Sequence, residues 1–90
     1  MGRVLLVEDD LAIAQPLARA LEREGHDVQV AAEGKAALAQ VRAGNQDLVV
    51  LDLGLPDLDG LEVCRRLRAD PATRNILVLM LVELLEQLLN

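Results

Sequence analysis

Two short apolar runs, each ending in acidic residues, constrain the fold of this chain most strongly. Residues 4–7 run directly into Glu8, Asp9 and Asp10, and residues 48–51 run directly into Asp52. A strand that is apolar at every position is covered on both faces, as in a parallel sheet with helices on either side. The two runs therefore predict inner strands of such a sheet.

Helical spacing of apolar residues alternates with strands along the chain. Residues 11, 14, 17, 18 and 21 predict a first helix that ends at Gly25. Proline has no amide hydrogen to donate, so it is tolerated in the first turn of a helix, where the amides have no helical partner. Pro16 therefore requires this helix to begin near Ala12 or Ile13. The remaining elements are predicted as a strand at 27–31, a helix at 34–43, a helix containing Leu61, Cys64 and Leu67, and a strand at 76–81. This alternation predicts an α/β fold with a parallel sheet.

The last nine residues follow a different pattern. Leucines at 81, 84, 85, 88 and 89 share one face of a helix, and polar residues share the other. We therefore expect a domain over residues 1–81, followed by a leucine-rich, amphipathic C-terminal helix at 82–90.

The composition excludes several classes of function. The chain has no Phe, Tyr or Trp and a formal net charge of −6, so it lacks the stacking platforms and positive charge of nucleic-acid-binding proteins. Its longest apolar run, residues 76–82, is too short to span a membrane. A single cysteine, Cys64, and the lack of a signal peptide before the first strand predict a cytoplasmic protein without disulfides.

The acidic residues after the first and third strands form a candidate metal site. In a parallel α/β sheet, ligands bind at the carboxyl ends of the strands, where the strand order reverses. In a doubly wound sheet with the order 2-1-3-4, the first and third strands are neighbours at that point, so Glu8, Asp9 and Asp52 would converge in one cleft. Clustered carboxylates repel one another unless a cation lies among them, and oxygen ligands with room for water suit Mg²⁺.

Helix capping is the alternative role for acidic residues that follow strands. It is the preferred interpretation of Asp10 at the first helix, and of Asp57 or Asp59 at the third helix. For Glu8, Asp9 and Asp52 together, the metal site is preferred.

The spacing of these residues resembles the receiver domain of bacterial two-component response regulators. The resemblance rests on the segments LLVEDD at residues 5–10 and DLGLPDLDG at residues 52–60, and it extends from about residue 3 to residue 81. It is greatest to receivers that precede a winged-helix DNA-binding domain. The resemblance implies a flavodoxin-like fold and a phosphorelay component that is not itself an enzyme.

The resemblance also implies roles for individual residues. Asp52 accepts a phosphoryl group from a sensor histidine kinase. Asp9 coordinates Mg²⁺ directly, Glu8 supports the ion directly or through water, and the backbone carbonyl of Gly54 is a further ligand.

Departures from the family pattern predict an incomplete receiver. Val82 stands where the family has a Ser or Thr after the fourth strand, Glu83 stands at the small residue that follows, and valine cannot donate a hydrogen bond. The family's lysine after the fifth strand has no counterpart, because Lys35, the only lysine, opens the second helix. We therefore expect a truncated receiver without the fifth strand and fifth helix, in which switching is impaired.

A structural or assembly module is the alternative function. The strand at 76–81 would form an apolar sheet edge, and the tail at 82–90 would add a second apolar surface. Both features favour a homodimer or higher homo-oligomer held together by the fourth strand and the tail.

Overall fold

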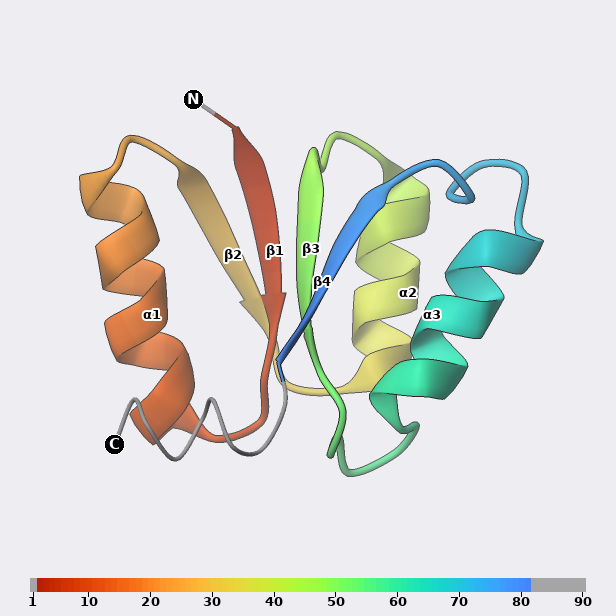
Figure 1. Ribbon diagram of the computed structural model, residues 1–90, viewed down its shortest axis with the longest axis horizontal. Coiled ribbons are helices and arrows are strands. Elements are labelled where there is room, and N and C mark those ends of the chain that lie inside the picture. The colour runs from red at the N-terminus through yellow and green to blue at the C-terminus, as the bar shows by residue number, and fades with distance from the viewer. Residues whose placement is uncertain (1, 82–90) are drawn as a thin grey trace.

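The computed structural model describes residues 2–81 of the chain. The predicted tail helix at 82–90, and with it Val82 and Glu83, lies outside the described residues. Within the described residues the chain forms β1 (Arg3–Val7), α1 (Leu11–Arg23), β2 (Asp27–Ala31), α2 (Gly34–Ala43), β3 (Leu48–Asp52), α3 (Gly60–Ala69) and β4 (Leu77–Leu81). The strands make one parallel sheet in the order β2-β1-β3-β4 (Figure 1), which confirms the predicted α/β fold and strand order.

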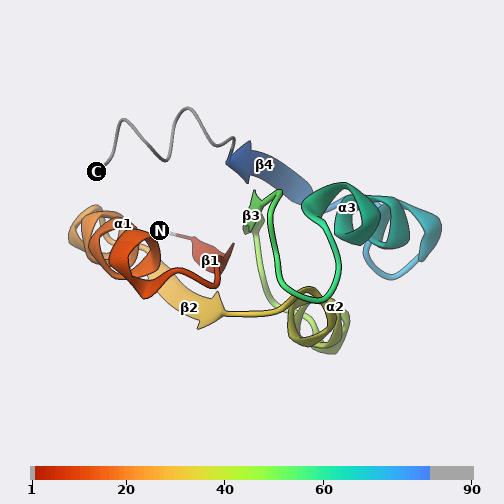
Figure 2. The ribbon, with the colours of Figure 1, turned by 90° about the horizontal axis from the view of Figure 1, so that it is seen from below.

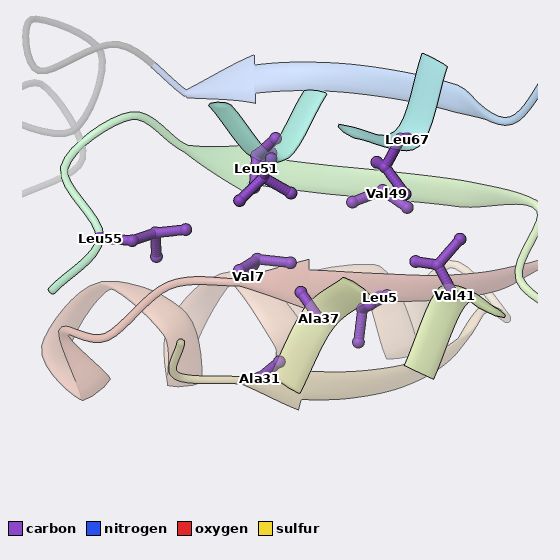
Figure 3. Packing of buried hydrophobic residues seen from close by; sticks show 10 residues of the cluster. Leu5, Val7, Ala31, Ala37, Val41, Val49, Leu51, Leu55 and Leu67 are labelled. Carbon is purple, nitrogen blue, oxygen red and sulfur yellow. The ribbon is translucent and has the colours of Figure 1, made fainter. Parts of the chain in front are cut away.

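Helices cover both faces of the sheet. α1 lies on one face, and α2 and α3 lie on the other (Figure 2). The core on the α1 side contains Val4, Leu6, Ala14, Val50 and Leu81. The core on the other side (Figure 3) contains Leu5, Val7, Ala31, Ala37, Val41, Val49, Leu51, Leu55, Val63 and Leu67. Alternate residues of β1 and β3 therefore enter different cores, which explains why these strands are apolar at every position. Among residues 2–81, no helix is long and apolar enough to cross a lipid bilayer.

α1 begins earlier than the position of Pro16 was expected to allow. The Asp10 side chain accepts a hydrogen bond from the Ala12 amide at 2.9 Å and caps a helix that starts at Leu11. Pro16 is then the sixth helical residue, and it cannot donate to the Ala12 carbonyl. The helix thus starts one residue before the predicted start near Ala12 or Ile13, because the cap at Asp10 fixes the first turn. Leu11, expected on the apolar face, is 57% exposed, whereas Ile13 is buried.

β4 carries an apolar strip that the described residues leave uncovered. Leu77 and Leu79 are 69% and 59% exposed. Leu79 is in register with Val50, whose side chain enters the core on the α1 side, so the strip lies on the α1 face of the sheet. In the part of the chain that the structure describes, β4 has a strand neighbour on one side only.

Candidate metal centre

Three carboxylates meet at the carboxyl ends of β1 and β3. Val7 of β1 is in register with Leu51 of β3, so the residues that follow them, Glu8 and Asp52, lie at the ends of neighbouring strands. One carboxylate oxygen from each of Glu8, Asp9 and Asp52 lies within 4.8 Å of the other two. The structure thus brings together the three side chains that the sequence predicted as ligands.

The three carboxylates differ in their surroundings. Glu8 is 1% exposed and Asp52 is 6% exposed, whereas Asp9 is open to solvent. Oε1 of Glu8 accepts a hydrogen bond from the Asp10 amide at 3.1 Å, and Oδ1 of Asp52 accepts one from the Gly54 amide at 3.2 Å. All five residues, together with Ile13 and Leu53, line a cleft of about 500 Å³.

This set of donors fits Mg²⁺. Two buried carboxylates and a third within 4.8 Å repel one another, and a divalent cation among them reverses that repulsion. Mg²⁺ prefers hard oxygen ligands and keeps several waters, which the open cleft admits. Gly54, whose carbonyl the family resemblance implies as a ligand, lines the same cleft. Metal binding by these four residues stays a prediction.

A larger hollow lies at the amino ends of the strands. Its volume is about 630 Å³, and Arg3, Asp27 and Asp47 are among its lining residues. Within residues 2–81, Glu8, Asp9 and Asp52 are the only group of three or more metal-ligating side chains that lie so close together. The cleft at the carboxyl ends is therefore the candidate metal site because of the side chains that line it, although the hollow at the amino ends is larger.

Gly60 packs against the backbone of Asp52, a contact that the sequence analysis missed. A Cβ atom on Gly60 would overlap the carbonyl oxygen of Asp52 and lie 2.9 Å from Cα of Leu53. The Gly60 amide also donates a hydrogen bond to the Leu53 carbonyl at 2.9 Å. A glycine in the first turn of a helix, where it weakens the helix, is a sequence sign of such a close backbone approach.

The two acidic residues considered as caps of the third helix have different partners. Asp59 accepts a hydrogen bond from the Glu62 amide at 2.8 Å and caps α3. Asp57 instead accepts hydrogen bonds from the Gly34 and Lys35 amides of α2, at 2.7 Å and 2.9 Å. These hydrogen bonds, the one from Lys35 above all, hold the pKa of Asp57 below its usual value. Of the two residues predicted as alternatives for the cap of the third helix, Asp59 takes that role, and Asp57 caps α2 instead.

Comparison with known proteins identifies relatives of this chain. Residues 4–87 match the family described as the response regulator receiver domain. The transcriptional regulatory protein TcrA of Mycobacterium tuberculosis is 48% identical over 77 residues, which make up 86% of this chain and 30% of that protein. The chain thus spans less than a third of the length of this curated relative.

Two solved structures share the fold. A chain in the crystal structure of histidine kinase ThkA in complex with response regulator protein TrrA is 34% identical, with a TM-score of 0.84 over 92% of this chain and 70% of that one. The receiver domain of sensor histidine kinase PA1611 from Pseudomonas aeruginosa PAO1 is 28% identical, with a TM-score of 0.86 over 90% of this chain and 66% of that one, and holds a magnesium ion coordinated in its active site cleft. The acidic motif, the strand order and these matches agree, and the chain belongs to the response regulator receiver domain family.

Proposed function

We propose that this chain is a phosphorelay receiver in which Asp52 accepts a phosphoryl group from a sensor histidine kinase, with Mg²⁺ held by Glu8, Asp9, Asp52 and the Gly54 carbonyl. The observation that carries the proposal is the buried Asp52 carboxylate within 4.8 Å of two further carboxylates in an open cleft. The magnesium ion in the PA1611 receiver and the kinase–regulator complex among the similar structures support it.

The chemistry that this site would perform is a transfer between two side chains. A carboxylate oxygen of Asp52 attacks the phosphorus of a phosphohistidine and forms a new P–O bond while the P–N bond breaks, and the electron pair of that bond stays on the imidazole nitrogen. The hydrogen bond from the Gly54 amide to Oδ1 fixes the orientation of the carboxylate. Bound Mg²⁺ would supply charge neutralisation for the transferring oxygens. The chain is an acceptor in this scheme and not an enzyme.

The proposed transfer depends on the metal, and intact-mass spectrometry tests this dependence. Incubation of the 90-residue chain with acetyl phosphate and Mg²⁺ should add one phosphoryl group. Excess EDTA should prevent the addition, because the charge on the transferring oxygens is then not neutralised within the acidic cleft. Asp52→Asn is the control for labelling elsewhere on the chain. Labelling that is equally fast with EDTA would contradict a metal-dependent site.

We also propose that phosphorylation of the 90-residue chain is slow and its switching impaired. The sequence has no Ser and one Thr, and the Thr73 hydroxyl donates to the Leu67 carbonyl at 2.7 Å, away from the cleft. The only lysine, Lys35, begins α2 and does not line the cleft. Loss of one preorganised donor typically costs about 10²–10³ in rate. The rate at which acetyl phosphate labels this chain should therefore be lower, by at least that factor, than the rate for a receiver that has both donors. Equal rates would refute the expectation.

The same proposal implies the type of regulator to which the chain belongs, its partners and its location. The match to a transcriptional regulatory protein, of which the chain covers 30%, suggests the receiver part of a regulator of the winged-helix type. In that setting the kinase would be the direct partner, the chain itself would bind neither nucleic acid nor membrane, and the site of action would be the cytoplasm.

Assembly is a second candidate function, favoured by the exposed strip of Leu77 and Leu79 on β4. We propose that the 90-residue chain forms a homodimer through β4, because an apolar edge strand pairs readily with a copy of itself. Light scattering at micromolar concentration should give about twice the 9.8 kDa chain mass. Leu79→Glu should shift the mass to that of the monomer. Leu61→Glu, a change at a leucine on α3 that is at least as exposed, should not. A folded, monodisperse species of 9.8 kDa for the unmodified chain would refute the dimer.

A further inference from the structure

α2 receives its N-terminal cap from a distant loop. Its own cap residue, Glu33, makes no side-chain hydrogen bond to the helix. The first two helical amides, of Gly34 and Lys35, instead donate to the two carboxylate oxygens of Asp57, which follows them by more than twenty residues. A carboxylate at a helix N-terminus is also favoured by the helix dipole. One side chain therefore joins the start of α2 to the loop between β3 and α3.

The packing around this junction is close. A Cβ atom on Gly34 would lie 2.8 Å from Cγ2 of Val63 and 3.0 Å from Cβ of Leu58. The start of α2 thus contacts the β3–α3 loop and the first turns of α3 directly. Any displacement of the loop that carries Asp57 must therefore displace the start of α2 as well, or break both hydrogen bonds.

The same loop carries part of the candidate metal centre. It follows Asp52, the last residue of β3, and includes Gly54, three residues before Asp57. It leads into Gly60, the first residue of α3, which packs against the Asp52 carbonyl. Leu55, which follows the exposed Gly54, is buried in the core and holds the start of the loop. Gly60 fixes the end of the loop, and Asp57 fixes the segment between Leu55 and Gly60. The path of the loop past Gly54 thus depends on all three anchors.

We infer that Asp57 is a positioning residue of the metal centre: by binding the Gly34 and Lys35 amides, it holds the loop so that Gly54 and Asp52 face the ion together. The inference rests on the proposed function, and Asp57 contacts neither the ion nor the phosphoryl group in it. Because coupling between two sites is reciprocal, Mg²⁺ at the cleft should in turn stabilise the contacts at the start of α2.

An Mg²⁺ titration followed by amide NMR of the 90-residue chain tests the inference. Asp57→Asn keeps the shape of the side chain but leaves one acceptor oxygen for two amides. It should weaken Mg²⁺ binding by roughly tenfold, the lower end of the loss that follows removal of an outer-shell partner. In the unmodified chain, the Gly34 and Lys35 amide resonances should shift along the same binding curve as those of Asp52 and Gly54.

Asp47→Asn is the matched control. Asp47 accepts a hydrogen bond from the Arg3 amide at 2.8 Å, so this variant loses the same charge and a similar contact between elements, at the opposite end of the sheet. Salt at about 0.15 M limits long-range charge effects, since it screens them beyond about 8 Å. Mg²⁺ affinity should remain within about twofold of the unmodified chain for this variant, because Asp47 lines the hollow at the opposite end of the sheet and not the cleft.

The outcomes separate this inference from the function on which it rests. If the unmodified chain does not bind Mg²⁺, the proposed site and this inference both fall. If it binds Mg²⁺ and Asp57→Asn binds as tightly as Asp47→Asn, only the positioning role is overturned. If Asp57→Asn does not fold, the Mg²⁺ titration of the unmodified chain is the remaining test. The inference would be overturned if the amide resonances of Asp52 and Gly54 shift with Mg²⁺ while those of Gly34 and Lys35 do not.

Discussion

Replacement of Asp9 with asparagine should abolish detectable Mg²⁺ binding by this chain. Asp9 is the exposed member of the three carboxylates and the one that the cleft presents to solvent, from which the ion arrives. Asparagine removes one of the negative charges that offset the dehydration of Mg²⁺. The loss should exceed the roughly 10–100-fold effect of removing an outer-shell partner, because a direct ligand is lost. Isothermal titration calorimetry measures the affinity without requiring an aromatic reporter, which the chain lacks.

Asp10→Asn is the control for this prediction. Asp10 is the next residue in the chain and lines the same cleft, but its carboxylate caps α1 by accepting from the Ala12 amide. Asparagine caps helices about as well as aspartate does, so α1 should remain intact. A similar loss of affinity in both variants would mean that general negative charge attracts the ion, and it would contradict direct coordination by Asp9.

Replacement of Gly60 with alanine should destabilise the fold by about 3 kcal/mol or more, at the upper end of the cost of overpacking a filled site. The added methyl group would overlap the Asp52 carbonyl and press on Cα of Leu53, and both are backbone atoms that cannot move aside as a flexible side chain can. Urea denaturation followed by far-ultraviolet circular dichroism measures the free energy of unfolding. Displacement of the Asp52 backbone should also weaken Mg²⁺ binding in whatever fraction remains folded.

Gly54→Ala is the matched control for Gly60→Ala. A Cβ atom there would meet only Oδ2 of Asp52, at the ordinary contact distance of 3.9 Å. Neither glycine has a positive φ, so the two variants differ in packing and not in backbone strain. Gly54→Ala should change the free energy of unfolding by less than about 0.5 kcal/mol, as for an open surface position. Equal destabilisation by the two changes would show that the close approach of Gly60 to Asp52 is not the reason why position 60 does not tolerate a side chain.

The doubly covered strands β1 and β3 and their acidic ends could be predicted from the residues alone, because an apolar run that ends in an acid indicates both a buried strand and the edge of the sheet at which it ends. The strand order, and with it the meeting of the three carboxylates, followed from the order of a doubly wound sheet and not from the spacing of these residues. The helix faces were less predictable. Leu61 belonged to the apolar spacing that predicted the third helix, but it is 67% exposed, because α3 buries the face that carries Gly60, Val63 and Leu67.

Contacts between distant parts of the chain were beyond the reach of the sequence pattern. Asp57 looks like a cap for the helix that follows it, and only the fold shows that the start of α2 lies closer. Gly60 likewise reads as a turn residue until the Asp52 carbonyl is seen against it. Both residues act on the site through partners that periodicity and spacing do not reveal.

The most direct test of the central claim is to locate the phosphoryl group. An acyl phosphate on an aspartate is reduced by borohydride to homoserine, whereas a phosphate ester or phosphoramidate is not. After treatment of the 90-residue chain with acetyl phosphate and Mg²⁺, borohydride reduction and tandem mass spectrometry should find homoserine at position 52. Homoserine at another acidic position, such as 9 or 57, or at none despite a mass gain, would contradict Asp52 as the acceptor.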